Sequence, residues 1–181
     1  VQLPLPEKLH GAFNIIPFKK DPDVLSKESK EKFKKRELSI LPPVVCAVSH
    51  LMKEYDISLK DKEIVLVGKG KLVGEPLSVW LSQKGIDFSV VKEDTEKSEE
   101  IIKKADVLIT GVGKADLIKG DMVKEGAVVM DAGTSFKEGK VSGDVDFETV
   151  SKKASYITPV PGGIGPLTVA CLLENLVGLN K

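Results

Sequence analysis

The 181-residue sequence predicts an α/β protein built on a Rossmann-like, doubly wound parallel sheet. Two observations carry this prediction. From residue 63 onward, short runs rich in Val and Ile alternate with segments long enough to form helices. The first of these runs is followed at once by a glycine-rich turn, Gly68 to Gly74. Strands that alternate with helices imply parallel pairing through right-handed crossovers. The length suits one full domain and a piece of another.

Composition excludes several classes of partner. The formal net charge is zero and the pI is near 6.9, so no general attraction to nucleic acid or to an anionic membrane is expected. No apolar run approaches the roughly 20 residues of a membrane span, and no signal peptide opens the chain. Small molecules or proteins are the expected partners, and a cytoplasmic location is expected. Because the sequence starts at Val1 inside a strand-like run, it could belong to a longer polypeptide, and a mitochondrial location stays open.

The first forty residues show weaker patterns. Residues 1–5 read as a short strand in which Gln2 is the polar residue; its amide could bind a planar amide ligand, but in isolation a solvated side chain is the simpler interpretation. Residues 7–16 could form a helix. Asp21 and Asp23 lie in a turn, where carboxylates cap the backbone more often than they catalyse. Residues 26–37 are densely charged and are expected to form a solvated loop or a mobile helix.

The remaining elements follow from periodicity. Pro42 and Pro43 introduce a helix that runs to about Tyr55. The predicted strands are 63–67, 87–91, 107–110 and 127–131, the predicted helices 75–84 and 97–105, and a hairpin is predicted at 135–142. Cys46 and Cys171 both lie on apolar helical patterns, so buried reduced thiols are expected rather than a disulfide or a metal pair. No metal site is predicted.

The turn after the first strand is the clearest binding signal. Gly68, Lys69, Gly70 and Gly74 fit G-x-G-x-x-x-G, in which glycines let the backbone approach a pyrophosphate at a helix N-terminus. Glu93 and Asp94 follow the second strand, where a carboxylate binds a ribose 2′-hydroxyl and repels a 2′-phosphate. The sequence therefore favours NAD over NADP, although an acidic loop before a helix is also ordinary capping chemistry.

Further turns lie at the ends of later strands. Gly111 and Gly113 follow the third strand, and Gly133 and Thr134 follow the fourth. Ligands in doubly wound sheets bind at the carboxyl ends of strands, so these turns are expected to line one crevice with the first. Each turn alone is also explained by glycine ending a strand.

Residues 158–170, TPVPGGIGPLTVA, combine three prolines with three glycines. Prolines fix φ and glycines free it, so this segment predicts a rigid, bare, ligand-facing loop rather than a simple connector. Gly165 as N-cap and Pro166 as first helical residue are expected to open an apolar helix through about Val177.

Five segments together closely resemble the methylenetetrahydrofolate dehydrogenase/methenyltetrahydrofolate cyclohydrolase family. They are VQLPLP at 1–6, VGKGKLVGEP at 67–76, KEGAVVMDAGT at 124–134, GKVSGDVDF at 139–147 and YITPVPGGIGPLTVA at 156–170. The likeness covers nearly the whole chain but only the later two thirds of the family's usual length. It implies that 1–41 is the remnant of an N-terminal α/β folate-binding domain, that 42–160 is the dinucleotide domain with its entry helix, and that the helix in 161–181 returns to the N-terminal domain.

The resemblance also implies an activity. NAD or NADP would accept a hydride from 5,10-methylenetetrahydrofolate, and hydrolysis would then give 10-formyltetrahydrofolate. Gln2 would contact the folate ring and assist hydrolysis, and Asp23 would accept hydrogen bonds from the aminopyrimidine edge. Pro161, Gly162 and Gly163 would border the folate and the nicotinamide. The resemblance further suggests a homodimer through an edge of the dinucleotide domain.

Some family motifs are replaced. The Tyr-x-x-x-Lys motif, whose lysine serves the hydrolytic step, is not among these residues, and PPVV at 42–45 stands where Pro-Cys-Thr-Pro is typical. We therefore expect the chain alone to bind dinucleotide but to turn over folate poorly. Two alternatives remain: a non-catalytic dinucleotide-binding or scaffold module of the same fold, and another small-substrate dehydrogenase.

Overall fold

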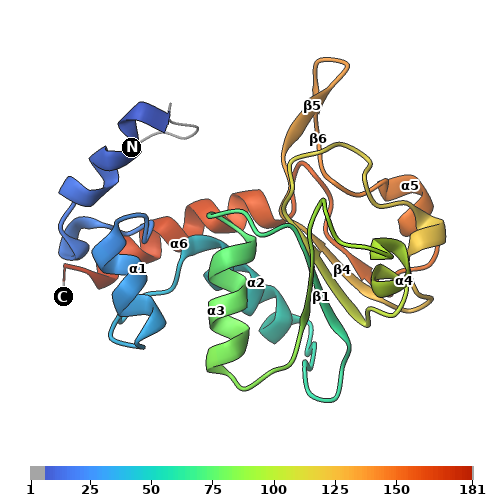
Figure 1. Ribbon diagram of the computed structural model, residues 1–181, viewed down its shortest axis with the longest axis horizontal. Coiled ribbons are helices and arrows are strands. Elements are labelled where there is room, and N and C mark those ends of the chain that lie inside the picture. Colours follow the sequence, from blue (N-terminus) through green and yellow to red (C-terminus); the bar gives the residue numbers. More distant parts are fainter. Residues whose placement is uncertain (1–6, 181) are drawn as a thin grey trace.

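The computed structural model describes residues 7–180 and contains a five-stranded parallel sheet (Figure 1). The strand order is β2-β1-β3-β4-β7. The strands are β1 Ile64–Val67, β2 Ser89–Val91, β3 Val107–Thr110, β4 Val128–Asp131 and β7 Tyr156–Ile157. The four strands expected from the sequence are confirmed. The two-residue β7 was not predicted, because so short a strand has no periodicity to detect.

Strand order places a crevice at one point of the sheet. The chain leaves β1 for β2 on one side and returns to β3 on the other side, so β1 and β3 flank the position where winding reverses direction. In such sheets, ligands bind outside the carboxyl ends of the strands at this position. The turns after Val67 and Thr110 therefore lie where a ligand is expected.

Helices cover both faces of the sheet, which explains why β1 is a continuous apolar run and why every residue of β1 and β3 is buried. Ile64 and Leu66 pack into one core with helices α2, α3 and α6, whereas Val65 and Val67 pack into a second core with α4 and α5. The bounds are α2 Pro43–Glu54, α3 Gly74–Gln83, α4 Ser98–Ile102, α5 Phe147–Val150 and α6 Ile164–Gly178, with the 3-10 turn η3 at Gly120–Met122. Helix α4 is shorter than the predicted 97–105.

The N-terminal segment lies at the far end of α6 from the sheet (Figure 1). It contains two 3-10 helices, η1 Glu7–Ile15 and η2 Phe18–Lys20, and helix α1 Lys27–Lys34. The expectation of a solvated loop or mobile helix at 26–37 is wrong in one respect, because α1 is packed. Ser26 caps it through Ser29 N, and Phe33 is buried. Asn175 of α6 holds the segment by donating to Pro22 O (2.8 Å) and Leu41 O (2.7 Å).

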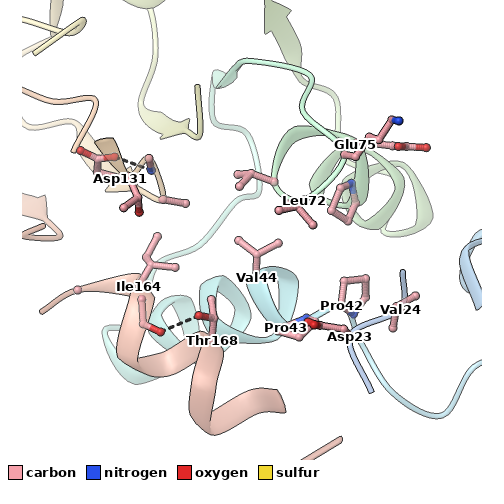
Figure 2. Close-up of a pocket in the computed structure, with 18 of the residues that line it drawn as sticks. Asp23, Val24, Pro42, Pro43, Val44, Leu72, Glu75, Asp131, Ile164 and Thr168 are labelled. Atoms are coloured by element: carbon pink, nitrogen blue, oxygen red, sulfur yellow. Dashed lines mark hydrogen bonds between the residues drawn. The ribbon is translucent and has the colours of Figure 1, made fainter. Parts of the chain in front are cut away.

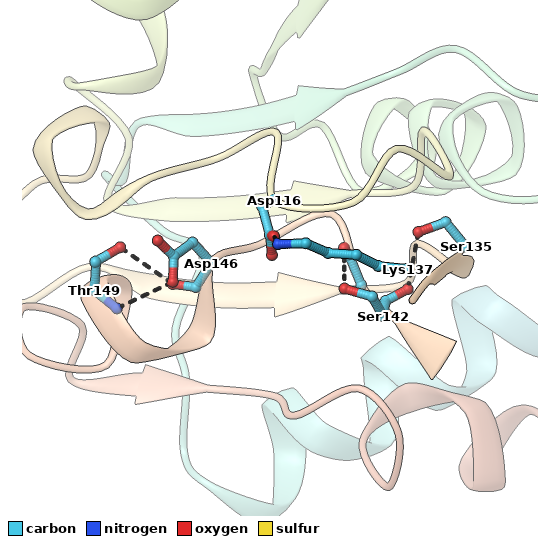
Figure 3. Close-up of polar contacts among 7 residues, drawn as sticks. Asp116, Ser135, Lys137, Ser142, Asp146 and Thr149 are labelled. Carbon is cyan, nitrogen blue, oxygen red and sulfur yellow. Dashed lines mark hydrogen bonds and ion pairs between the residues drawn. The ribbon is translucent and has the colours of Figure 1, made fainter. Parts of the chain in front are cut away.

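The predicted hairpin is confirmed as β5 Ser135–Lys137 and β6 Lys140–Ser142. It projects beyond the sheet (Figure 1). Figure 3 shows two of its contacts: Lys137, in the strand pair next to the turn, pairs with Asp116 of the loop after β3, and at the base Ser135 Oγ donates to Ser142 O (3.2 Å). Just beyond the hairpin, Asp146 caps α5 by accepting from Thr149 N.

Two expectations about α6 are corrected. The helix begins at Ile164 with Gly163 as N-cap, two residues before the predicted first residue Pro166. Ile164 is buried and fixes the start, and a proline is tolerated at the third position because first-turn N–H groups have no helical acceptor. The second correction concerns Cys46 and Cys171, which are buried as expected but joined in a disulfide.

One further observation bears on the expected absence of a membrane span. In the part of the chain that the structure describes, none of the helices combines the length and the apolar character needed to cross a bilayer.

Candidate functional site

The glycine turn after β1 folds tightly onto the start of α3. Gly68 has φ of +92° and donates from its N–H to Val91 O (2.8 Å), which ties the turn to the end of β2. A Cβ on Gly74 would collide with the carbonyl oxygen of Gly68, so only glycine lets the helix begin this close to the strand. The N-terminus of α3 therefore faces the carboxyl end of β1, as an anion site requires.

The turn after β3 lies against the first turn. A Cβ on Gly111 would collide with the side chain of Val73, and a Cβ on Gly70 would come within 3.8 Å of Gly111 O. Further along, a Cβ on Gly113 would lie 3.4 Å from Thr134 O. The turns that are expected to line one crevice thus lie side by side, from the Gly68 turn over Gly111 and Gly113 to Thr134 after β4.

Asp144 organises the middle of this crevice, and sequence reasoning assigned it no role. Its buried carboxylate accepts from Thr110 Oγ1 (2.7 Å) and from the N–H groups of Val112 (2.6 Å), Gly113 (2.8 Å) and Lys114 (2.8 Å). The carboxylate thus fixes the turn after β3 from a position two residues beyond the end of β6. The signal in the sequence was an acidic residue, Asp144 of GKVSGDVDF, that stands between Gly143 and Val145.

Asp131 at the end of β4 forms a second buried carboxylate beside Asp144. It accepts from Gly133 N (2.8 Å) and Val145 N (2.9 Å), while its own N–H donates to Thr158 Oγ1 (2.8 Å). Burial raises the pKa of Asp131 from 3.8 to about 6, against the opposing effect of its backbone donors. The two aspartates together hold three loops: those after β3 and β4, and the one before α6.

A cleft of about 410 Å³ opens between this carboxylate corner and the N-terminal segment. Figure 2 shows Asp131 and Ile164 at one end and Asp23, Val24 and Pro42 at the other. Leu72 and Glu75 form one side, and Val44 of α2 with Thr168 of α6 forms the opposite side. The expected loop residues Pro161, Gly162 and Gly163, together with Gly133 and Thr134, also line this cleft.

Asp23 is the carboxylate at the far end of the cleft. Burial raises its pKa above the ordinary value, and the neighbouring Asp21 adds to the effect. Asp21 itself has a structural role, because it accepts from Leu25 N (3.1 Å) and Ser26 N (2.8 Å). Across the cleft, Lys34 of α1 pairs with Glu75 of α3 at 3.3 Å. The N-terminal segment therefore completes the cleft.

Other candidate residues lie elsewhere. Glu93 and Asp94 are exposed in a short turn after β2, closed by Thr95, and do not line the cleft. The hydrogen bond from Gly68 N to Val91 O places this turn near the glycine turn after β1. Lys69 is exposed in the glycine turn. Gln2 lies outside the described residues.

The glycine turns and the cleft are neighbours, because Gly113 lies against Thr134 O and Thr134 lines the cleft. Residues 42–181 match the family model described as the tetrahydrofolate dehydrogenase/cyclohydrolase, NAD(P)-binding domain. The chain belongs to this family. Its family membership and its doubly wound sheet establish it as a nicotinamide dinucleotide-binding domain, and the fold expected from the sequence is confirmed.

Individual relatives agree with the family match. The chain is 40% identical over 183 residues to the bifunctional protein FolD of Lactobacillus helveticus, and it covers 65% of that protein. The solved FolD dehydrogenase/cyclohydrolase of Campylobacter jejuni superposes with a TM-score of 0.92 at 40% identity, over 99% of this chain and 65% of that one. The Trypanosoma brucei enzyme, solved with NADP and an inhibitor, gives 0.90 at 33% identity, over 99% of this chain and 65% of that one. The chain thus spans about two thirds of the length of these relatives.

Proposed function

We propose that the protein oxidises 5,10-methylenetetrahydrofolate to the methenyl compound and that the methenyl compound is then hydrolysed to 10-formyltetrahydrofolate. The observation that carries this proposal is the shared wall between crevice and cleft. Residues 131–134 line the cleft, and Gly113 of the crevice lies against Thr134 O. Two ligands bound on either side of this wall would meet there. A bound NAD or NADP would supply the hydride acceptor.

Hydride transfer depends mainly on holding the two reacting carbons in contact, with little acid or base chemistry. In the proposed arrangement, the α3 N-terminus and Gly68, Lys69, Gly70 and Gly74 hold the pyrophosphate. Gly111, Gly113, Gly133 and Thr134 guide the nicotinamide toward the cleft. Pro161, Gly162 and Gly163 separate it from water on the side of α6.

Asp23 is proposed to anchor the other end of the folate. A carboxylate in a mostly apolar cleft accepts two hydrogen bonds from an aminopyrimidine, and such a pair is lost when the carboxylate becomes an amide. In a longer protein that carries the Tyr-x-x-x-Lys motif, we expect Asp23→Asn to raise the KM for methylenetetrahydrofolate at least tenfold while leaving dinucleotide affinity unchanged. Asp87→Asn, an exposed change outside the cleft, is the matched control. Equal KM values for both variants would remove Asp23 from the proposal.

The hydrolytic step is assigned to the whole protein. The Tyr-x-x-x-Lys motif of the family is not among these 181 residues, so no described residue takes the lysine's role. Gln2 is proposed to assist hydrolysis. We assign residues 1–41 to the folate-binding domain, 42–160 to the dinucleotide domain and 161–181 to the helix that returns to the first domain.

The decisive experiment compares this chain with the longer protein that includes the Tyr-x-x-x-Lys motif. We expect both to bind dinucleotide in calorimetric titrations and only the longer one to form reduced nicotinamide efficiently from methylenetetrahydrofolate. Equal rates would contradict the proposed need for the segment that carries the Tyr-x-x-x-Lys motif. A chain that binds neither dinucleotide nor a folate analogue would instead be a scaffold module.

The choice between NAD and NADP is proposed to rest on Glu93 and Asp94. Their carboxylates border the crevice and favour a free ribose 2′-hydroxyl, so NAD is the proposed cofactor. Replacing both by Gln and Asn should raise kcat/KM for NADP relative to NAD at least tenfold in the longer protein, since two charges that repel a 2′-phosphate are removed. An unchanged ratio would place the discrimination elsewhere. A cytoplasmic homodimer is the proposed working form, and light scattering tests its mass.

A further inference from the structure

Four side chains with metal-binding atoms converge where α2 packs on α6, outside the proposed site. Cys46 and His50 come from α2, and Cys171 and Glu174 come from α6. One ligand atom from each lies within 4.8 Å of all the others. Among the described residues, this is the group of His, Cys, Asp and Glu side chains with the spacing of a metal site.

Helix geometry explains the convergence. Cys46 and His50 are separated by four positions and Cys171 and Glu174 by three, so each pair lies on one face of its helix. The two faces meet: the Cα atoms of the cysteines are 6.1 Å apart, and His50 Nε2 lies 3.5 Å from Glu174 Oε2. Cys46 Sγ is 3.8 Å from the same carboxylate oxygen. In a tetrahedral zinc site with bonds of about 2.0 to 2.3 Å, neighbouring ligand atoms are about 3.3 to 3.8 Å apart.

Burial and access also fit a metal. The two sulfurs lie at the buried base of the group, and His50 and Glu174 form its exposed rim. His50, Cys171 and Glu174 line a groove that connects the group with solvent and provides an entry path. Two thiolates, an imidazole and a carboxylate form a donor set that suits borderline-soft Zn²⁺ better than Mg²⁺ or Ca²⁺.

We propose that, when the Cys46–Cys171 disulfide is reduced, Cys46, His50, Cys171 and Glu174 bind one zinc ion. The helices α2 and α6 are then fastened either by the disulfide or by the metal. The same backbone positions serve both states, because rotation about the Cα–Cβ bonds lets the sulfurs separate to a tetrahedral edge. This site differs from the sequence-based expectation of no metal, and it is independent of the proposed folate chemistry.

Reduction of the Cys46–Cys171 disulfide consumes two electrons and two protons. A phosphine reductant takes an oxygen atom from water and becomes its oxide, while the two electrons cleave the S–S bond and the two protons of water give two thiols. Zinc binding then releases both thiol protons to solvent. The sulfurs of a disulfide are uncharged and far weaker donors than thiolates, so the oxidised protein lacks two of the four ligands.

The test uses the complete 181-residue chain in two redox states. Phosphine-reduced protein, freed of reductant under argon, is titrated with Co²⁺, whose tetrahedral thiolate complexes give intense visible and sulfur-to-metal charge-transfer bands. Zn²⁺ should displace the cobalt at one equivalent. Oxidised protein of the same sequence should give neither band. Equal metal binding by both states, or no thiolate bands in the reduced state, would overturn the proposal.

Variants assign the ligands. Cys46→Ser or Cys171→Ser alone should weaken the charge-transfer bands and the double variant should abolish them, and His50→Ala should weaken Zn²⁺ binding at least tenfold. Glu174→Gln should weaken Zn²⁺ binding in the same direction. His10→Ala, which removes the chain's other histidine, should have no effect. Far-ultraviolet circular dichroism checks that each reduced variant is folded. Full affinity in folded His50→Ala protein would exclude the proposed ligand set.

Discussion

At the scale of single residues, the functional geometry depends on two buried aspartates whose partners are mostly backbone N–H groups. Asp144 holds the turn after β3 through three N–H groups and one hydroxyl. Asp131 holds the turn after β4 and the residue that follows Asp144. Neither is proposed to touch a ligand. Their role is to keep the glycine turns open in the conformation that a dinucleotide needs.

Asp144→Asn should destabilise the protein by roughly 2 to 4 kcal/mol, because an amide has one acceptor oxygen and leaves some of the buried donors without a partner. Denaturation in urea measures the loss. Asp146→Asn is the matched control two residues away, where Asn is as good a helix cap as Asp and the expected change is below about 0.5 kcal/mol. Similar losses for both variants would contradict the special role of Asp144.

Asp131 should make stability depend on pH with an uncommon sign. Its pKa is raised from 3.8 to about 6, so between these values the folded chain holds a proton that the unfolded chain has released. Stability contributed by this group therefore falls as pH rises through that window, by about 3 kcal/mol in total. The free energy of unfolding of Asp131→Asn relative to the wild type should rise by that amount between about pH 4 and pH 7. Parallel pH profiles would refute the raised pKa.

At the scale of elements, the glycine turn and α3 form one unit. A Cβ on Gly74 would collide with backbone atoms of Gly68 and Lys69, which cannot move aside as a flexible side chain could. Gly74→Ala should lower the free energy of unfolding by about 1 to 3 kcal/mol. It should also weaken dinucleotide binding by more than this loss of stability explains. Calorimetric titration and thermal unfolding provide the two readouts.

Gly178→Ala is the control for that substitution. A Cβ there meets Ile40 Cγ2 at an ordinary 3.5 Å, and alanine favours a helix by up to about 1 kcal/mol. It should leave dinucleotide binding intact. If both variants bind dinucleotide like the wild type, the tight turn is not required for binding.

The strands were predictable because a strand that is buried on both faces consists mostly of apolar residues, as in Ile64–Val67. Helix α1 was harder to predict, since Phe33 is its one buried apolar residue. The start of α6 was placed too late because proline usually marks the first helical position, whereas here the packing of Ile164 decides. Tertiary contacts therefore determined that α1 forms and where α6 begins, which the local sequence did not determine.

At the scale of the whole molecule, α6 connects the sheet to the N-terminal segment. Its first turn borders the cleft, and Asn175 near its other end donates to Pro22 O and Leu41 O. Long-range contacts also explain which parts of the candidate site could not be predicted from the sequence. The glycine turns were visible in the sequence, but Asp144 lies about thirty positions from its donors, and the two cysteines are separated by 125 positions. No local pattern reports pairings at these distances.

Asn175→Ala should loosen the N-terminal segment while leaving the sheet intact. Two backbone carbonyls lose their donor, at a cost of about 1 to 3 kcal/mol, and hydrogen exchange should quicken in residues 18–41 but not in β1 and β3. Asn180→Ala, which removes one exposed hydrogen bond from the same helix, should leave exchange unchanged. Uniform acceleration across the sheet would mean that the two parts open together.

The carboxylate corner also limits how this protein can evolve. A Cβ on Gly133 would collide with the carboxylate of Asp144, and a Cβ on Gly143 would collide with that of Asp131. Each glycine thus lies beside the other loop's aspartate, and a side chain at either glycine would displace a carboxylate that holds a neighbouring turn. Asp131 and Gly133 also line the cleft, so the same corner shapes the cleft and the turns beside it. Over evolution, we therefore expect changes at these four positions to be coupled, because each alters a loop that another of the four holds.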